Sequence, residues 1–250
     1  MFLKENKMKN KELWKPTRFI VDENNNLQVN PATLGTGSDL TRTYHLHNIN
    51  RLIKTYIKGK LLDLGCGYVP FYEFYKNLIT DSVCMDWANS YHQNPFIDVY
   101  HDINKPFPLP DNEFDSILCT GVLEHIYKPH DLFKECHRIL KQNGNLLITS
   151  VLSYCEHEPP FDYFRNTQYF LQRIASELDF EVVELITIGD GLFVMADISE
   201  KILASTPYKD DKHLKNLNNL LKFLIEKYTD NGIPLLENFP KGHLTVLRKK

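Results

Sequence analysis

Short apolar runs alternate with helical stretches from residue 60 onward, a pattern typical of a parallel sheet with crossover helices. It predicts strands over residues 60–64, 82–86, 98–101, 116–120, 145–151, 181–188 and 243–248. Helical spacing predicts helices from Ser38 or Asp39 to about residue 58, and over 70–78, 129–140 and 167–178. A turn at Asn143-Gly144 follows the third of these helices. The predicted fold is α/β: a Rossmann-like, mostly parallel seven-stranded sheet flanked by helices.

Residues 190–242 interrupt this alternation with two further helical stretches, 192–204 and 212–228, the second ended by Asn231-Gly232. We interpret them as a helical insertion before the last strand. It could serve as an acceptor lid or a homodimer surface, or its apolar stripe could be plain core. Residues 1–37 are polar, end in Gly35-Thr36-Gly37, and are predicted to be a mobile arm or irregular cap outside a main domain of residues 38–250.

Composition narrows the class of protein. The chain has 250 residues, 42% hydrophobic and 24% charged, as expected for one globular domain. Its net charge is −3 and no lysine/arginine stripe recurs, which argues against a nucleic-acid partner. Five cysteines without a C-x-x-C pair indicate a reducing compartment, and the charged N-terminus resembles neither a signal peptide nor a membrane anchor. A cytoplasmic location away from membranes is predicted.

A glycine turn, Gly65-Cys66-Gly67, follows the apolar strand 61–64. Glycines at alternate positions let the backbone approach a ligand closely. The dinucleotide fingerprint requires a third glycine three residues later, where this chain has Pro70. Asp63 also places an anion before the turn, which would repel a pyrophosphate but suits the ammonium of a bound amino acid. The nicotinamide dinucleotide interpretation is therefore rejected.

Two more carboxylates follow the next strands. Asp86 ends the second strand, where it can accept hydrogen bonds from ribose hydroxyls, although a solvated strand end would look the same. Asp102 is placed for an adenine amino group, with Ile103 offering its backbone N–H and apolar bulk. Three acids at successive strand ends favour a site for an amino-acid-bearing nucleoside.

The chain resembles the class I methyltransferases that use S-adenosylmethionine, in their small-molecule type 11 branch. The resemblance covers roughly residues 40 to 190. It rests on LLDLGCG at 61–67, CMDW at 84–87, HDINKPFPLPDNEFDSILCTGVLEHI at 101–126 and DLFKECHRILKQNGNLLITS at 131–150. Val69 and Asn143-Gly144 depart from common family residues, and these departures concern local geometry.

The resemblance implies S-adenosylmethionine as the cofactor and assigns roles by position. Asp63 and the backbone of Gly65 and Gly67 would hold the methionine part, and Asp86 the ribose. The other implied contacts are Trp87 beside the adenine, Asp102 and Ile103 against it, and Thr120 and Gly121 near the sulfonium.

The segment 154–165 follows the fifth strand and concentrates titratable and aromatic side chains in a proline-containing loop. Such loops commonly bind the acceptor. We predict His157 as the general base, with Asp162 and Arg165 orienting the acceptor; Tyr154 and Tyr163 complete the predicted acceptor-binding set. A loop that only caps the sheet, with the aspartate and arginine paired, is the alternative.

His125 is a second base candidate, although packing near the cofactor is the more frequent role of such a histidine. A metal site built from His157, Glu156, Glu158 and Asp162 has no standard spacing and is rejected, so no metal is predicted.

The acceptor is predicted as a small molecule. Nucleobase methylation is disfavoured, because residues 119–122 lack the Asn/Asp-Pro-Pro-aromatic motif of those enzymes. The loop is similar to members associated with bacterial surface-polysaccharide assembly, which implies transfer to a hydroxyl of a sugar, sugar nucleotide or sugar substituent. The alternatives are N-methylation of a small metabolite or sugar amide, and a non-catalytic protein that binds the cofactor.

Overall fold

The computed structural model describes residues 8–23, 26–34, 37–88, 94–205, 207–230 and 238–250. Their main sheet has seven strands in the order β5-β4-β3-β6-β7-β9-β8. The first five in sequence are parallel: β3 (Gly59–Leu64), β4 (Ile79–Asp86), β5 (Val99–Tyr100), β6 (Phe114–Cys119) and β7 (Leu140–Val151). β9 (Gly242–Lys249) is antiparallel to both β7 and β8 (Phe180–Ile188). The predicted Rossmann-like, mostly parallel seven-stranded sheet is confirmed.

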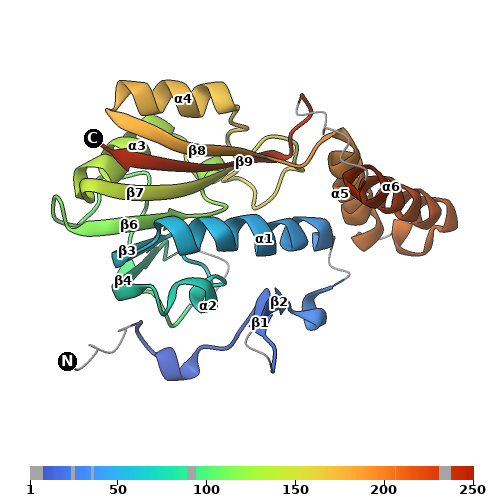
Figure 1. Ribbon diagram of the computed structural model, residues 1–250, viewed down its shortest axis with the longest axis horizontal. Helices are drawn as coiled ribbons and strands as arrows, with labels where there is room; N and C mark the ends of the chain where they lie inside the picture. The colour runs from blue at the N-terminus through green and yellow to red at the C-terminus, as the bar shows by residue number, and fades with distance from the viewer. Residues whose placement is uncertain (1–7, 24–25, 35–36, 89–93, 206, 231–237) are drawn as a thin grey trace.

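Helices cover both faces of this sheet (Figure 1). α3 (Pro129–Ile139) and α4 (Gln168–Glu177) lie on one face, and α1 (Asp39–Tyr56) and the short α2 (Tyr72–Tyr75) lie on the other. Each face has its own apolar cluster. Leu62 belongs to the cluster under α3 and α4, whereas its neighbour Leu61 belongs to the cluster under α1, as the alternation of side chains along a strand requires. The result is a three-layer core.

Arg138 of α3 connects two of the sequence stretches on which the family resemblance rests, 101–126 and 131–150. Its guanidinium donates to the carbonyl oxygen of Leu109 (2.8 Å) and to the carboxylate of Asp111 (2.6 Å), and it also pairs with Glu135. These bonds hold the segment before β6 against α3. Leu109, Asp111 and Arg138 therefore have a structural role in this part of the chain.

The N-terminal residues differ from the prediction. The arm contains η1 (Lys11–Leu13), the antiparallel strands β1 (Phe19–Val21) and β2 (Leu27–Val29), and η2 (Pro31–Thr33). The buried ring of Phe19 packs on Phe71 and Phe74, with centroids 5.6 and 4.9 Å apart. This apolar contact anchors the described part of the arm, which forms a two-stranded hairpin where the sequence predicted a mobile arm or irregular cap.

Two further boundaries are corrected. The helix predicted over 70–78 is a single turn, α2. Its aromatic residues Tyr72, Phe74 and Tyr75 are all buried, and β4 already begins at Ile79. Asn143 and Gly144 lie inside β7, where Asn143 has φ 61° and the pairing with β6 shifts register. They form an irregularity within the strand and do not precede it as a turn.

α5 (Gly191–Ala204) and α6 (Lys212–Asp230), joined through η4 (Tyr208–Asp210), lie between β8 and β9 in the chain, where the two helical stretches are predicted. They project from one end of the sheet (Figure 1). The predicted stop at Asn231-Gly232 lies outside the described residues, as do Gly35 and Thr36. Among the described helices, none has both the length and the apolar character needed to cross a bilayer.

Candidate functional site

A cavity of about 400 Å³ opens where β3, β4 and β6 end. This volume is within the range of small-molecule sites, and the carboxyl ends of parallel strands are where open α/β sheets bind ligands. Ten of the fifteen predicted site residues line it: Gly65, Gly67, Asp86, Trp87, Asp102, Ile103, Thr120, Gly121, His125 and Tyr163. The other five, Asp63, Tyr154, His157, Asp162 and Arg165, do not.

The glycine turn forms one wall. Gly65 (φ 67°) donates its N–H to the carbonyl oxygen of Met85 (2.8 Å), and a Cβ there would stand 2.2 Å from a methyl of Val122. Gly67 also has a positive φ, 49°, but a Cβ there would meet no atom within 4 Å. Packing therefore requires the first glycine, whereas the second leaves its space to the cavity.

Asp86 ties this turn to the end of β4. One carboxylate oxygen accepts the Gly67 N–H (2.7 Å) and the other accepts the Trp87 N–H (2.6 Å). Backbone donors thus fix the orientation of a carboxylate that lines the cavity. A carboxylate oxygen can accept more than one hydrogen bond, so this arrangement is compatible with a ligand hydroxyl.

Hydrogen bonds also fix Asp102 and Gly121 at the edge of the cavity. The Asp102 carboxylate accepts the Asn104 N–H (3.1 Å) and lies 3.5 Å from the Lys105 ammonium. Although partial burial opposes the effect, these donors lower the pKa of Asp102 and keep it ionised. The Gly121 N–H donates to the hydroxyl of Thr149 on β7 (2.8 Å).

Asp63 lies behind this wall. It is 4% exposed and accepts a hydrogen bond from the Tyr75 hydroxyl (2.9 Å). Burial raises the pKa of Asp63 to about 7; the Tyr75 bond opposes this and the charge of Asp86 adds to it. The structure does not place this carboxylate in the cavity lining.

His125 is the cavity-lining histidine of the two candidates. Its Nδ1 lies 2.6 Å from the carbonyl oxygen of Phe161, in the loop of residues 152–166, which we term the acceptor loop. Because a carbonyl oxygen only accepts, Nδ1 carries the proton and Nε2 has the lone pair in the neutral ring. The sequence ranked this residue second as a base candidate, and the structure places it in the cavity lining.

His157 packs behind His125, with ring centroids 4.7 Å apart. Its Nδ1 lies 3.3 Å from Asp162, and its backbone N–H donates to the same carboxylate (2.9 Å). The Arg165 guanidinium donates two hydrogen bonds, of 2.6 and 2.7 Å, to the Asp162 carboxylate. This pairing holds the pKa of Asp162 well below its usual range. The aspartate–arginine pair named as the alternative is thus present. The Tyr154 ring also packs against that of His157, with centroids 5.0 Å apart.

Glu124 was not predicted as a site residue. It is 3% exposed, burial raises the pKa of its carboxyl, and Oε1 lies 3.9 Å from Nε2 of His157. One nitrogen or oxygen atom each of Glu124, His125 and His157 lies within 4.8 Å of the others. Glu156 and Glu158, considered for a metal site, are exposed instead. The only sequence signal for Glu124 is its place beside His125 in the motif.

Several cavity residues escaped the sequence analysis. Thr17 and Arg18 come from the arm assigned outside the main domain, and no local motif marks them. Phe161 and Glu158 belong to the acceptor loop, whose composition did indicate a site. Tyr127 faces Tyr163 at 5.9 Å, so aromatic rings border the acceptor side.

Comparison with known proteins agrees with this geometry. A family model described as "Methyltransferase domain" matches residues 62–148. A ubiquinone biosynthesis O-methyltransferase of Glaesserella parasuis is 30% identical over 128 residues, 42% of this chain and 54% of that protein. The chain spans about half the length of the curated relatives it matches.

Solved structures share the fold. A putative sarcosine dimethylglycine methyltransferase from Galdieria sulphuraria superposes with a TM-score of 0.55 at 17% identity, over 95% of this chain and 94% of that one. The [4+2]-cyclase SpnF superposes with a TM-score of 0.54 at 17% identity, over 82% and 80%. The fold alone therefore does not determine the reaction. The family match, however, shows a methyltransferase domain over residues 62–148, and the sheet around it has the fold of these solved structures.

Proposed function

We propose that this protein transfers a methyl group from S-adenosylmethionine to a hydroxyl of a small carbohydrate-type acceptor. One observation supports this most directly. The glycine turn and the anchored carboxylates share a single cavity with His125 and the acceptor-loop aromatics Phe161 and Tyr163. Cofactor, base and acceptor groups can therefore meet in one space.

The residues present fit the cofactor. The open space over Gly67 admits a close ligand, Asp86 is oriented to accept from ribose hydroxyls, and Asp102 can accept from an amino group. A diphosphate would meet these acids at close range, which is unfavourable. When bound, S-adenosylmethionine supplies an electrophilic methyl on a sulfonium. The task of the chain is alignment, which can lower a barrier by about 7–11 kcal/mol.

We assign the base to His125 and place His157 behind it, the reverse of the order expected from the sequence. The unprotonated Nε2 of His125 can take the proton of an acceptor hydroxyl, because the Phe161 carbonyl holds the other nitrogen protonated. Asp162 and Arg165 steady His157 and the acceptor loop. In this proposal Asp162, Arg165 and Tyr154 support the loop from outside the cavity.

Aromatic rims and a cation favour a sugar nucleotide or acidic sugar as acceptor. Tyr127, Phe161 and Tyr163 line the cavity and can stack on sugar faces, and Arg18 adds a guanidinium suited to phosphate or carboxylate. A role in bacterial surface-polysaccharide biosynthesis is consistent with this chemistry and rests on the resemblance of the loop. The five free cysteines support a cytoplasmic location.

The test is a transfer assay with methyl-labelled cofactor against a panel of sugar nucleotides, followed by NMR of the product. The proposal expects a new O-methyl group on a sugar carbon for at least one member. A new N-methyl group on an amino sugar would replace the hydroxyl assignment with the amine alternative. Binding of cofactor without transfer to any member would refute the carbohydrate assignment.

A further inference from the structure

α5 is packed with its polar side inward. Three of its polar residues are buried, at 0%, 5% and 6% exposure: Asp197, Ser199 and Glu200. Three of its large apolar residues are exposed, at 52%, 44% and 37%: Met195, Ile198 and Ile202. Although Phe193 and Ala196 are buried as well, this departs from the usual amphipathic arrangement, in which the apolar stripe faces the core.

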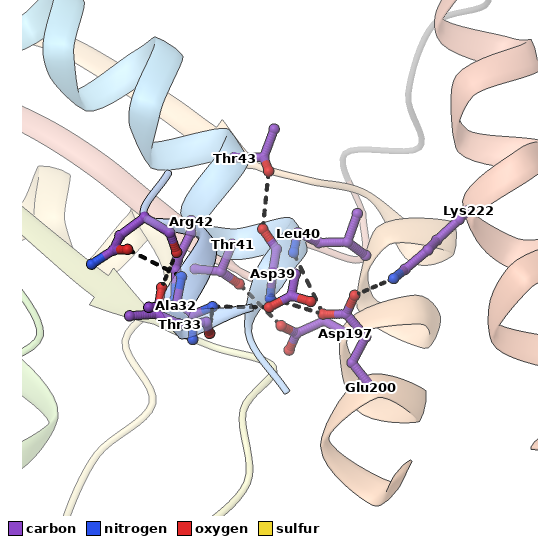
Figure 2. Close-up of polar contacts among 11 residues, drawn as sticks. Ala32, Thr33, Asp39, Leu40, Thr41, Arg42, Thr43, Asp197, Glu200 and Lys222 are labelled. Carbon is purple, nitrogen blue, oxygen red and sulfur yellow. Dashed lines mark hydrogen bonds and ion pairs between the residues drawn. The ribbon is translucent and has the colours of Figure 1, made fainter. Parts of the chain in front are cut away.

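Glu200 has a defined partner on two sides (Figure 2). Its Oε2 accepts the backbone N–H groups of Asp39 (3.1 Å) and Leu40 (3.4 Å), at the start of α1. Its Oε1 pairs with Lys222 of α6 (2.7 Å). One buried carboxylate thus joins α5 to the N-terminus of α1 and to α6.

Asp197 fixes the same orientation. It accepts from the Thr41 hydroxyl (3.0 Å), pairs with Lys201 (2.6 Å), and contacts the buried Lys241 before β9. A rotation of α5 about its axis that buried the apolar side would separate these charges from their partners, which is strongly unfavourable. The apolar side of α5 is therefore held outward by the chain itself.

α6 extends this surface. Lys222 points to Glu200, hence toward the buried side, and Leu220 is two residues earlier, on the opposite side of the helix. Leu220 and Leu217 are 53% and 43% exposed. By the same spacing, Ile198 lies opposite Glu200 on α5. We term these exposed apolar residues of the two helices the hairpin face: Met195, Ile198, Ile202, Leu217 and Leu220.

The charge of this hairpin restricts its partner. Residues 191–230 contain six lysines and six acidic residues, so their formal charge is zero. Lys201, Lys222 and Lys215 pair with acids of the same segment, the last with Asp210 at 3.0 Å. An anionic membrane or a strongly charged protein would gain little here, because surface binding of that kind requires an excess of opposite charge. A neutral apolar face of the same shape is complementary.

We propose that the hairpin face is covered by a second copy of this chain, with the two α5–α6 hairpins packed about a two-fold axis. Such an isologous contact places each apolar side chain against another, in the manner of a four-helix bundle. The helices have 14 and 19 residues, so they present a face about 20–28 Å long. Two such faces would bury on the order of 1,000 Å² in total, near the lower limit for specific dimers. This inference rests on the packing of the hairpin and goes beyond the proposed methyl transfer.

The test is sedimentation equilibrium of the full chain over a hundredfold range of concentration. The expected result is a reversible rise from one to two chains. The double variant Ile198→Glu/Leu220→Glu is expected to stay at one chain throughout. Leu13→Glu, which changes a 59% exposed leucine of the arm, is the matched control and is expected to dimerise like the parent.

Three results would overturn the proposal. The first is a parent protein that remains a single chain at every concentration. The second is a double variant that is folded by circular dichroism and still dimerises. The third is a monomeric parent that floats with neutral phosphatidylcholine vesicles while the double variant does not, which would assign the face to a lipid surface. Should the double variant unfold, the parent's own sedimentation still decides.

Discussion

Trp87, at the end of β4, meets Phe161 of the acceptor loop edge to face, with ring centroids 4.8 Å apart and planes at 85°. The backbone N–H of the tryptophan is bonded to Asp86, while the carbonyl of the phenylalanine is bonded to His125. One aromatic contact therefore connects the proposed cofactor side of the cavity with its proposed base.

Replacing His125 should slow methyl transfer without weakening cofactor binding. We expect His125→Asn to lower kcat by about 10²–10⁴-fold, the usual contribution of a general base, with little change in affinity for S-adenosylhomocysteine. His157→Asn, the matched variant behind it, should lose much less. Single-turnover kinetics and calorimetry provide the measurement. A larger loss at His157 would restore the order expected from the sequence.

The two glycines of the turn should respond differently to alanine. Gly65→Ala sets a Cβ 2.2 Å from Val122 and should reduce the free energy of unfolding. Gly67→Ala meets no protein atom, so it should cost only the strain of a positive φ, about 1 kcal/mol, while occupying ligand space. We expect it to weaken cofactor binding more than stability. Thermal unfolding and calorimetry on both variants test this, and equal effects on stability would count against it.

The buried carboxyl of Asp63 should make stability depend on pH. Burial raises its pKa to about 7 from 3.8, so the fold favours the neutral acid. This stabilisation is complete below about pH 4 and is lost as pH rises through about 7, a difference on the order of 4 kcal/mol. Asp63→Asn stays neutral and keeps an acceptor for Tyr75. Its stability relative to the parent should therefore increase from pH 4 to pH 8 in urea unfolding without cofactor; a constant difference would contradict the assignment.

Arg18 should act on the acceptor. It lines the cavity together with Glu158 of the acceptor loop. We expect Arg18→Gln to raise KM for an anionic sugar nucleotide at least tenfold, because a charge-assisted hydrogen bond is lost. Affinity for S-adenosylhomocysteine should change little. The opposite pattern, with cofactor affinity lost and KM retained, would move this guanidinium to the cofactor.

Chelation should leave the reaction intact. Glu124, His125 and His157 lie close enough together to hold a metal ion. As a base, however, His125 needs an Nε2 that is not bound to a metal. Dialysis against a chelator should therefore not change kcat. If activity were lost on dialysis and returned with zinc, this cluster would have to be assigned as a metal centre.

The sheet and most of the cavity were accessible from sequence because they depend on local signals. Apolar runs mark β3, β4 and β6. Residues at or just beyond the ends of these strands, Gly65, Asp86 and Gly121, meet at one edge by the rule for parallel strands. The arm was not predictable in this way. Thr17 and Arg18 reach the cavity only because Phe19 packs on distant rings of the α2 region.

The order in which we propose the two histidines as base also depends on contacts that local sequence does not show. His157 lies in the more titratable segment, but Asp162 turns it toward the protein, whereas His125 is aimed by the Phe161 carbonyl 36 residues later in the chain. α5 illustrates the same limit. Its composition predicts an apolar helix, and only tertiary ion pairs show which side is buried.

The central claim is that the cavity at the ends of β3, β4 and β6 receives an amino-acid-bearing nucleoside. Isothermal titration of the chain with S-adenosylhomocysteine tests it most directly, with Asp86→Asn as comparison. The account predicts one site per chain, weakened at least tenfold in the variant. Absence of binding by S-adenosylhomocysteine, or saturable binding of a nicotinamide dinucleotide in its place, would contradict it.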